Sequence, residues 1–262
     1  MADAERVIPM EGIHNFRDYG GYRARSGILR RGTLWRSGHH SEATPDDLER
    51  VHTLDIATVI DLRGDSERAL NPCLRHEDFS GDVLFHPGET AGSSGQAAHE
   101  EAAREVQTAA DAHAAMVRLY ESMPWRPVLV GTYRLMFDAL ANRDGASLLH
   151  CLAGKDRTGL GAALVHNLLG VHPDDAMADY LLTNSAGNIE ARIGAGARHV
   201  RAGFGPEMDE DAIRTLMSVH PEYLETALAR IRERHGSVEA YAAEVLGVDP
   251  ALLERIEARL IA

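Results

Sequence analysis

Residues 146–170 read ASLLHCLAGKDRTGLGAALVHNLLG, which joins a short apolar run, a segment with two glycines and a longer apolar pattern. The run Ala146 to His150 predicts a buried strand, because short continuous apolar runs are typical of strands covered on both faces. The pattern from Leu160 to Leu169 predicts a helix that ends at Gly170. A strand that enters a helix through a tight loop is a building unit of α/β folds.

The same alternation of strand and helix occurs earlier in the chain. Apolar runs predict strands within Ile28 to Ser37, from Ile56 to Leu62 and around Val83 to His86. Between the first two runs, Thr44 is followed by a proline and two aspartates, which predicts the start of a helix. This order predicts an α/β fold with a mostly parallel central sheet flanked by helices.

The chain after Gly170 has a helical pattern throughout. His172-Pro173, His220-Pro221 and Asp249-Pro250 each precede a run with helical apolar spacing, and proline is favoured at the first position of a helix. We therefore expect C-terminal helices that cover the sheet, and a single domain over residues 1–262.

Residues 88–125 form a possible lid inserted into this domain. Gly88 to Gln96 has the composition of a flexible segment, and Ala97 to Tyr120 has a helical pattern with a thin apolar side. A helix with so little apolar surface would be held weakly. The segment is therefore either an exposed connecting helix or a mobile lid.

Composition and charge exclude several classes of partner. The 262 residues are 44% hydrophobic and 26% charged, which is typical of a globular protein. The net charge of -13 argues against a nucleic-acid partner, because binding phosphate backbones requires a basic face. Met1 to Met10 carries charged residues, and no apolar run approaches the roughly 18 residues of a membrane span. We expect a cytoplasmic protein without integral membrane association, with export by a route that lacks a cleavable signal left open.

The sequence offers no obvious metal or disulfide framework. Cys73 and Cys151 are too few for a set of disulfides or a four-cysteine zinc site. The histidines show no metal-ligand spacing with cysteines or acids. We therefore expect neither a metal nor a cofactor.

The loop between the predicted strand and helix has the residues of an anion site. Amides of a tight loop that runs into a helix N-terminus carry partial positive charge, which suits phosphate. Gly154 and Gly159 allow the backbone to turn, and Arg157 offers a planar fork for two phosphoryl oxygens. Cys151 begins this loop, and such positive surroundings favour a thiolate nucleophile that attacks phosphorus to give a phosphocysteine.

The segment HCLAGKDRTG (residues 150–159) matches the Cys-x5-Arg signature of protein tyrosine phosphatases. More closely, the chain resembles the bacterial triple-specificity tyrosine and phosphoinositide phosphatases, whose loop reads HCxAGKDRTG. The resemblance also covers five further short motifs along nearly the whole chain: Asn15 to Asp18, Leu34 to Ser37, Asp61 to Arg63, Asp179 to Leu181 and Pro221 to Leu224.

The resemblance implies a role for each residue of the loop, and a protein tyrosine phosphatase-like fold. Cys151 would be the nucleophile and Arg157 the phosphate clamp, with His150 orienting the loop and Thr158 bonded to the sulfur. Phosphate would be bound by the loop from its first residue to its last: Cys151, Leu152, Ala153, Gly154, Lys155, Asp156 and Arg157. Lys155, the only lysine in the chain, is associated in relatives with inositol phospholipid recognition.

The proton donor for the leaving group has two candidates. Many relatives use an aspartate after a Trp-Pro or Phe-Pro pair, but this chain has His86-Pro87-Gly88 there. Asp156 lies in the loop itself, and Glu89 follows the position of the missing aspartate. We favour Asp156, because relatives with this loop are thought to use it.

The expected activity is hydrolysis of phosphotyrosine in proteins, with phosphoserine, phosphothreonine and phosphoinositides as further substrates. A binding module without turnover would be expected to lack the nucleophile or the arginine, whereas Cys151 and Arg157 are both present. An arsenate reductase or a sulfurtransferase would also use a cysteine in an anion loop, and Cys73 is the only further thiol. Two roles stay open for the charged motifs, since Arg17, Asp18, Arg36 and the Asp61-Arg63 turn suit either internal ion pairs or substrate contact.

Overall fold

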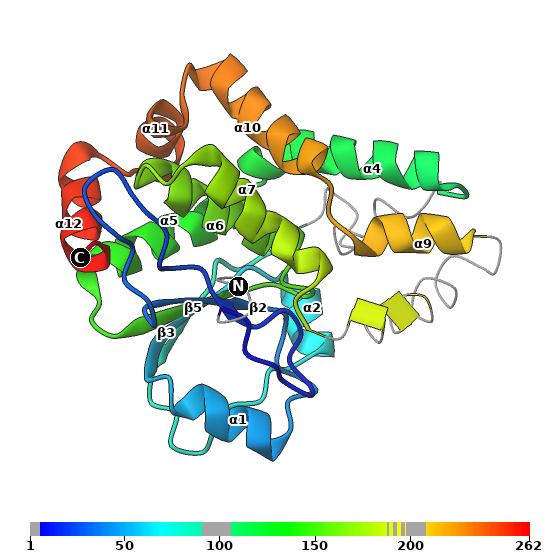
Figure 1. Ribbon diagram of the computed structural model, residues 1–262, viewed down its shortest axis with the longest axis horizontal. Helices are drawn as coiled ribbons and strands as arrows, with labels where there is room; N and C mark the ends of the chain where they lie inside the picture. Colours follow the sequence, from blue (N-terminus) through cyan, green and yellow to red (C-terminus); the bar gives the residue numbers. More distant parts are fainter. Residues whose placement is uncertain (1–5, 91–105, 188, 191–192, 195–196, 198–207) are drawn as a thin grey trace.

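The structure, a computed structural model, describes residues 6–90, 106–187, 189–190, 193–194, 197 and 208–262 (Figure 1). Its strands form one sheet in the order β1-β2-β5-β3-β4. Strands β2, β5, β3 and β4 are parallel, and the edge strand β1 is antiparallel to β2. The bounds are β1 (Arg17–Asp18), β2 (Leu34–Ser37), β3 (Ile56–Asp61), β4 (Asp82–Leu84) and β5 (Ala146–His150).

The mostly parallel sheet expected from the sequence is confirmed, with two local differences. Strand β5 has the expected bounds and is buried at every position, as a central strand should be. The run from Ile28 contributes a strand only at its end, because Ile28 and Leu29 instead form isolated bridges, Leu29 with Ile261. Strand β1 was not predicted, since it has only two residues and both are charged.

Helices cover both faces of the sheet, so the fold has three layers (Figure 1). On one face lie α1 and an apolar cluster that includes Phe16, Trp35 and Leu148. On the other face a larger cluster includes Leu149, and the two leucines of β5 therefore point to opposite sides. The α-helices of the described residues are α1 (Pro45–His52), α2 (Asp65–Leu70), α4 (Ala109–Ser122), α5 (Pro127–Asn142), α6 (Asp156–Leu168), α7 (Pro173–Leu181), α9 (Glu210–Met217), α10 (Pro221–His235), α11 (Val238–Tyr241) and α12 (Pro250–Leu260).

Proline and capping residues start the helices as expected. Helices α7, α10 and α12 each have proline at the first turn. The Thr44 hydroxyl accepts a hydrogen bond from the Asp47 amide at 3.2 Å, which caps α1.

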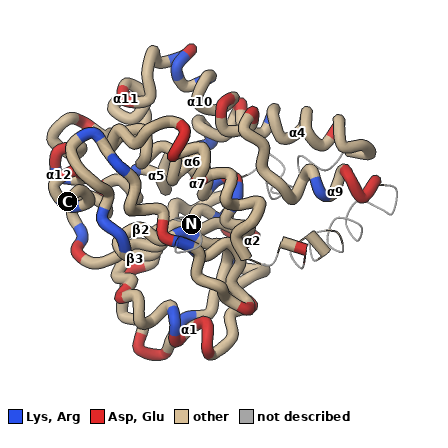
Figure 2. Tube along the Cα trace, viewed as in Figure 1, with Lys and Arg blue, Asp and Glu red and all other residues tan. Residues whose placement is uncertain are grey.

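Among the described helices, none has both the length and the apolar character needed to cross a bilayer. In Figure 2 the described basic and acidic residues are interspersed over several elements, in keeping with the net charge of -13.

Helix α4 is packed more extensively than its sequence suggests. It lies against α9 and α10 (Figure 1) and buries one face, made of Ala112, Ala115, Met116, Leu119 and Tyr120. The expectation of a thin apolar side overlooked the alanines and the tyrosine, which extend that face. Residues 91–105 of the predicted lid lie outside the described residues. The lid and the single domain stay predictions.

A buried ionic cluster attaches α7 to the sheet. Asp179 of α7 accepts hydrogen bonds from Arg17 of β1 at 3.2 Å and from Arg36 of β2 at 2.7 Å. All three side chains are at most 1% exposed. Burial alone would raise the pKa of Asp179, but the two guanidinium groups hold it below its usual range. These motif residues therefore form internal ion pairs.

Replacing Asp179 tests this attachment. The variant Asp179→Asn leaves two buried arginines without a counter-charge, so we expect the free energy of unfolding to fall by about 3–5 kcal/mol. Asp174→Asn, at an exposed position in the first turn of the same helix, should cost less than about 1 kcal/mol. Denaturant unfolding measures both, and equal losses in the two variants would contradict the role of the cluster.

Candidate active site

Residues 151–157, which the sequence predicts to bind phosphate and which we call the phosphate loop, connect β5 to α6. Cys151 is the first residue after β5 and is only 2% exposed. Helix α6 begins at Asp156, which is four residues before the expected start at Leu160. The end of the loop is therefore the first turn of a helix, where backbone N–H groups have no partner within the helix and carry partial positive charge.

The carbonyl groups of this loop are tied to neighbouring elements. The Leu152 carbonyl accepts from the His39 amide at 3.0 Å. The Gly154 carbonyl accepts from Asn15 Nδ2 at 2.7 Å and from an Arg36 guanidinium nitrogen at 3.2 Å. The Tyr133 hydroxyl, from α5, donates to the Arg157 carbonyl at 2.6 Å. The loop is thus positioned through its acceptors.

Five amides of the loop remain available. Within the described part of the chain, no group accepts a hydrogen bond from the N–H groups of Leu152, Ala153, Gly154, Asp156 and Arg157. Buried or half-buried N–H groups are normally paired, so a row of unpaired ones next to a helix N-terminus indicates an anion site. This arrangement agrees with the phosphate site that the sequence predicts.

Gly154 permits the close approach of the loop to β2. Its φ of +65° lies in the left-handed region. A Cβ at this position would stand 2.4 Å from the Ser37 carbonyl atoms, which is a severe clash with backbone. Only glycine fits both requirements.

Arg157 is fixed by a buried carboxylate. Its two terminal nitrogens donate to the two carboxylate oxygens of Glu67 in α2, at 2.5 and 2.8 Å. Burial alone would lower the pKa of Arg157, but Glu67 more than offsets this and raises it. The Arg157 Nε–H has no acceptor among the described residues, so it is free to donate to a bound oxygen. No local pattern in the sequence indicates Glu67, because only the fold brings α2 to the loop.

The two candidate proton donors have different surroundings. Asp156 accepts from the Tyr120 hydroxyl of α4 at 2.9 Å, and its carboxylate lies 3.5 Å from Lys155 Nζ. Glu89 instead accepts from the Ser66 amide and hydroxyl at 2.9 and 2.8 Å, and so binds the first turn of α2. Asp156 is part of the phosphate loop, whereas Glu89 is committed to a structural contact.

Lys155 connects the phosphate loop to α9. Its Nζ donates to the Ser218 carbonyl at 3.2 Å and to the Leu216 carbonyl, at the C-terminal end of α9. The side chain is 4% exposed. A second phosphate at this lysine would therefore have to compete with two backbone carbonyls.

A model of the tyrosine phosphatase family matches residues 8–262. The chain belongs to the tyrosine phosphatase family. A Cupriavidus necator protein, whose name describes it as a tyrosine-protein phosphatase, is 32% identical over 94% of this chain and 86% of its own length. The Mycobacterium tuberculosis triple specificity protein phosphatase PtpB is 28% identical over 98% of this chain and 99% of its length. The crystal structure of Pseudomonas aeruginosa TpbA covers 71% of this chain and 86% of its own, with 19% identity and a TM-score of 0.30.

His150 and Thr158 are the two supporting residues that the resemblance implies for this phosphatase. His150 Nδ1 lies 3.3 Å from the Cys151 carbonyl oxygen, and burial lowers the pKa of His150 to about 4, so the ring is neutral at neutral pH. The Thr158 hydroxyl is buried and bonds to no described atom, Sγ of Cys151 included. Among the described residues, the hydroxyl therefore does not make the bond to sulfur that the resemblance implies.

The Asp61-Arg63 turn is an ion pair at a strand end. Arg63 donates to both carboxylate oxygens of Asp61 at 2.9 and 2.7 Å, and both side chains are 2% exposed. Of the two roles open from the sequence, the structure thus favours the internal pair.

Cys73 accepts a hydrogen bond from the His40 amide at 3.3 Å, as a half-buried structural cysteine would.

The Glu67 contact can be tested by a conservative change. Glu67→Gln keeps the shape but removes the charge that fixes Arg157, so we expect kcat/KM for p-nitrophenyl phosphate to fall by about 100-fold. Glu190→Gln alters a similar two-bond pair with Arg214 on the surface and should leave the rate unchanged. Steady-state kinetics on both proteins measure the difference. A rate equal to wild type in Glu67→Gln would show that Arg157 does not need its partner.

Proposed function

We propose that this phosphatase hydrolyses phosphotyrosine in proteins through a phosphocysteine on Cys151, with no metal or other cofactor in the chemical step. One observation carries the proposal. The phosphate loop is held by its carbonyls, while the amides of Leu152, Ala153, Gly154, Asp156 and Arg157 make no hydrogen bond to the described residues, in a loop that starts at buried Cys151 and ends at a fixed Arg157. A tetrahedral dianion is the ligand that this set of donors fits best.

In the first step the Cys151 thiolate would attack phosphorus in line with the bond to the leaving oxygen. An S–P bond forms and the P–O bond breaks. The loop amides and Arg157 hold the three remaining phosphoryl oxygens, and so stabilise the charge of the transition state. The leaving oxygen takes a proton from Asp156 as the bond breaks.

In the second step water would attack the phosphocysteine. The Asp156 carboxylate takes a proton from this water, the S–P bond breaks, and the thiolate returns with release of inorganic phosphate. Tyr120 and Lys155 contact Asp156 and would keep its carboxyl group at the loop in both steps. Glu89, the other candidate acid, accepts two hydrogen bonds from Ser66, and this structural contact favours Asp156 as the acid.

Membership of the tyrosine phosphatase family supports phosphotyrosine as the substrate class. PtpB is named a triple specificity phosphatase, which suggests phosphoserine and phosphothreonine as further substrates here. Phosphoinositide hydrolysis would use Lys155 as a second cation, and the carbonyls of α9 would have to release it. We place the activity in the cytoplasm, on phosphorylated proteins.

Cysteine chemistry is tested by two matched variants. We expect Cys151→Ser to lower the turnover of p-nitrophenyl phosphate by at least about 1000-fold, because a hydroxyl is a weak nucleophile at neutral pH. Cys73→Ser, at the other free thiol, should keep the wild-type rate. Both assays contain a chelator. A rate that needs metal, or one that survives in Cys151→Ser, would refute the mechanism, and a wild type without turnover would favour a binding module.

The role of Asp156 is tested by varying the leaving group. Asp156→Asn should slow phenyl phosphate hydrolysis by about 100- to 10,000-fold, because phenolate leaves poorly without a proton. The rate of the first step with p-nitrophenyl phosphate should change far less, since its leaving group is stable as an anion. Glu89→Gln is the control and should leave the ratio of the two rates unchanged. If Glu89→Gln shows the leaving-group effect and Asp156→Asn does not, the acid is Glu89.

A further inference from the structure

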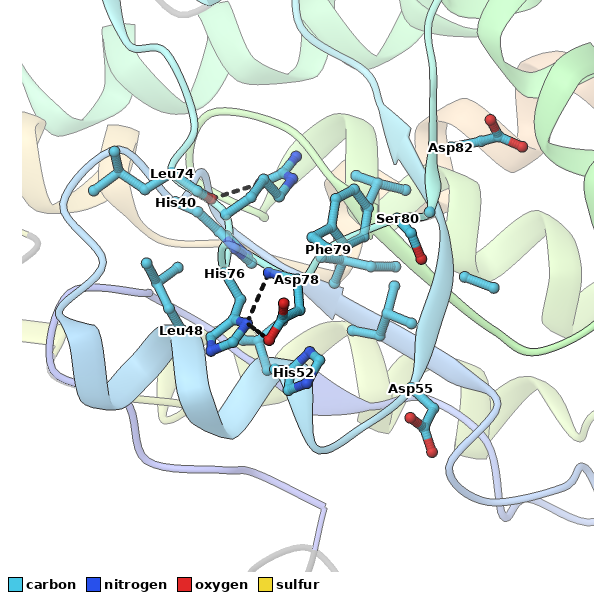
Figure 3. A pocket seen from close by; sticks show the side chains of 17 residues that line it. His40, Leu48, His52, Asp55, Leu74, His76, Asp78, Phe79, Ser80 and Asp82 are labelled. Carbon is cyan, nitrogen blue, oxygen red and sulfur yellow. Dashed lines mark hydrogen bonds and ion pairs between the residues drawn. The ribbon is translucent and has the colours of Figure 1, made fainter.

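A pocket separate from the phosphate loop lies beside α1 (Figure 3). Its volume is about 320 Å³, and its walls come from α1, β3 and the segment 74–82 before and within β4. Two histidines and an aspartate gather at its edge: His52 from the last turn of α1, and His76 and Asp78 from the segment that precedes β4. Figure 3 shows His76 directed at Asp78, with the His52 ring next to it.

These three side chains offer ligand atoms within one small volume. One nitrogen of each histidine and one carboxylate oxygen of Asp78 all lie within 4.8 Å of one another. His76 Nδ1 is 3.8 Å from Asp78 Oδ2, and the centres of the two imidazole rings are 4.1 Å apart. Two imidazoles and a carboxylate are ligands that zinc and related transition metals prefer.

We propose that His52, His76 and Asp78 bind a divalent transition metal ion of the zinc class, such as Zn²⁺ or Co²⁺. Three protein ligands leave a fourth position of a tetrahedral site for water. The carboxylate of Asp78 and that of nearby Glu49 supply negative charge for the ion.

Glu49 gives this site the outer contact that metal-bound histidines usually have. His76 Nε2 lies 3.2 Å from Glu49 Oε2, on the side of the ring away from Asp78. A histidine that binds metal through Nδ1 would donate its Nε2–H to this carboxylate, which fixes the tautomer and orientation of the ring. Glu49 and His52 are three residues apart on α1, so one face of the helix supplies both.

Small side-chain movements would complete the site. The two rings are stacked at 14°, and they must turn for both nitrogens to face one ion. His52 is exposed, and apart from this stacking its ring makes no hydrogen bond to a described group, so it can turn toward an ion. His76 Nδ1 would exchange its hydrogen bond from the Asp78 amide, at 3.2 Å, for the metal.

Metal binding would join α1 to the segment that contacts His40. The Leu74 amide donates to the His40 carbonyl at 3.1 Å, and the centres of the His40 and His150 rings are 5.8 Å apart. None of the three ligands belongs to the phosphate loop. We therefore assign the ion a structural role. It would stabilise the packing of α1 against the segment 74–82, which contacts His40, and would leave the chemical step unchanged.

The proposed site departs from the expectation that the histidines have no metal-ligand spacing. Glu49-x-x-His52 and His76-x-Asp78 are each short patterns of a metal site, but 24 positions of sequence separate the two histidines. Each pattern alone is common on protein surfaces. Only the packing of the segment against α1 brings them together.

Metal titration tests the proposal. The full chain, without a histidine tag and treated with chelator, is titrated with Co²⁺ while its visible absorption is recorded, and with Zn²⁺ by calorimetry. We expect one ion per chain, the visible bands of tetrahedral Co²⁺, and a higher melting temperature with Zn²⁺, because an ion that binds only the folded state stabilises it. His52→Gln and His76→Gln should lose these signals, and Glu49→Gln should weaken binding by about 10- to 100-fold.

His172→Gln is the matched control. His172 and Asp174 repeat the His-x-Asp arrangement, with 3.6 Å between His172 Nδ1 and Asp174 Oδ2. The Asp174 amide donates a hydrogen bond to His172 Nδ1 at 3.3 Å. No second described histidine shares that cluster, so this variant should bind metal like wild type. Because His52 is exposed, His52→Gln should fold normally, which circular dichroism checks. Absence of one-to-one binding in wild type, or equal losses in His52→Gln and His172→Gln, would overturn the proposal.

Discussion

The phosphate loop has to be rigid without using its own amides. An N–H that donates to another protein group cannot also donate to a phosphoryl oxygen. The loop must therefore be positioned through its other polar atoms. The structure meets this constraint with carbonyl anchors. His39 holds the Leu152 carbonyl, Asn15 and Arg36 hold that of Gly154, and Tyr133 holds that of Arg157.

Much of the surrounding architecture serves these anchors. Strand β2 runs parallel to β5, which places Arg36 beside the loop, and Asp179 of α7 forms ion pairs with both Arg36 and Arg17 inside the protein. Buried charges carry a large desolvation cost, which pairing and hydrogen bonding offset. The same principle applies to Arg157, whose buried partner Glu67 keeps it charged and oriented. The cluster is thus a framework for the anion site.

The sequence predicted the parts of this site that are local in the chain. The strand, the loop and the helix of residues 146–170 follow from apolar pattern, glycines and helix signals, and Cys151, Asp156 and Arg157 lie within that segment. Contacts between distant segments were not predictable, because periodicity says nothing about which elements meet. Glu67, Tyr120 and the His52 cluster are examples. The contact of the Lys155 ammonium with the Ser218 carbonyl, at the end of α9, is a further example.

A covalent intermediate is the central claim, and it can be trapped. In Asp156→Asn with p-nitrophenyl phosphate, the first step needs no proton donor while the attack of water lacks its base, so the phosphoenzyme should accumulate. Rapid acid quenching followed by peptide mass spectrometry locates the phosphoryl group. We predict that it is found on the sulfur of Cys151. A phosphoryl group on any other residue, or hydrolysis at the wild-type rate without an intermediate, would contradict the account.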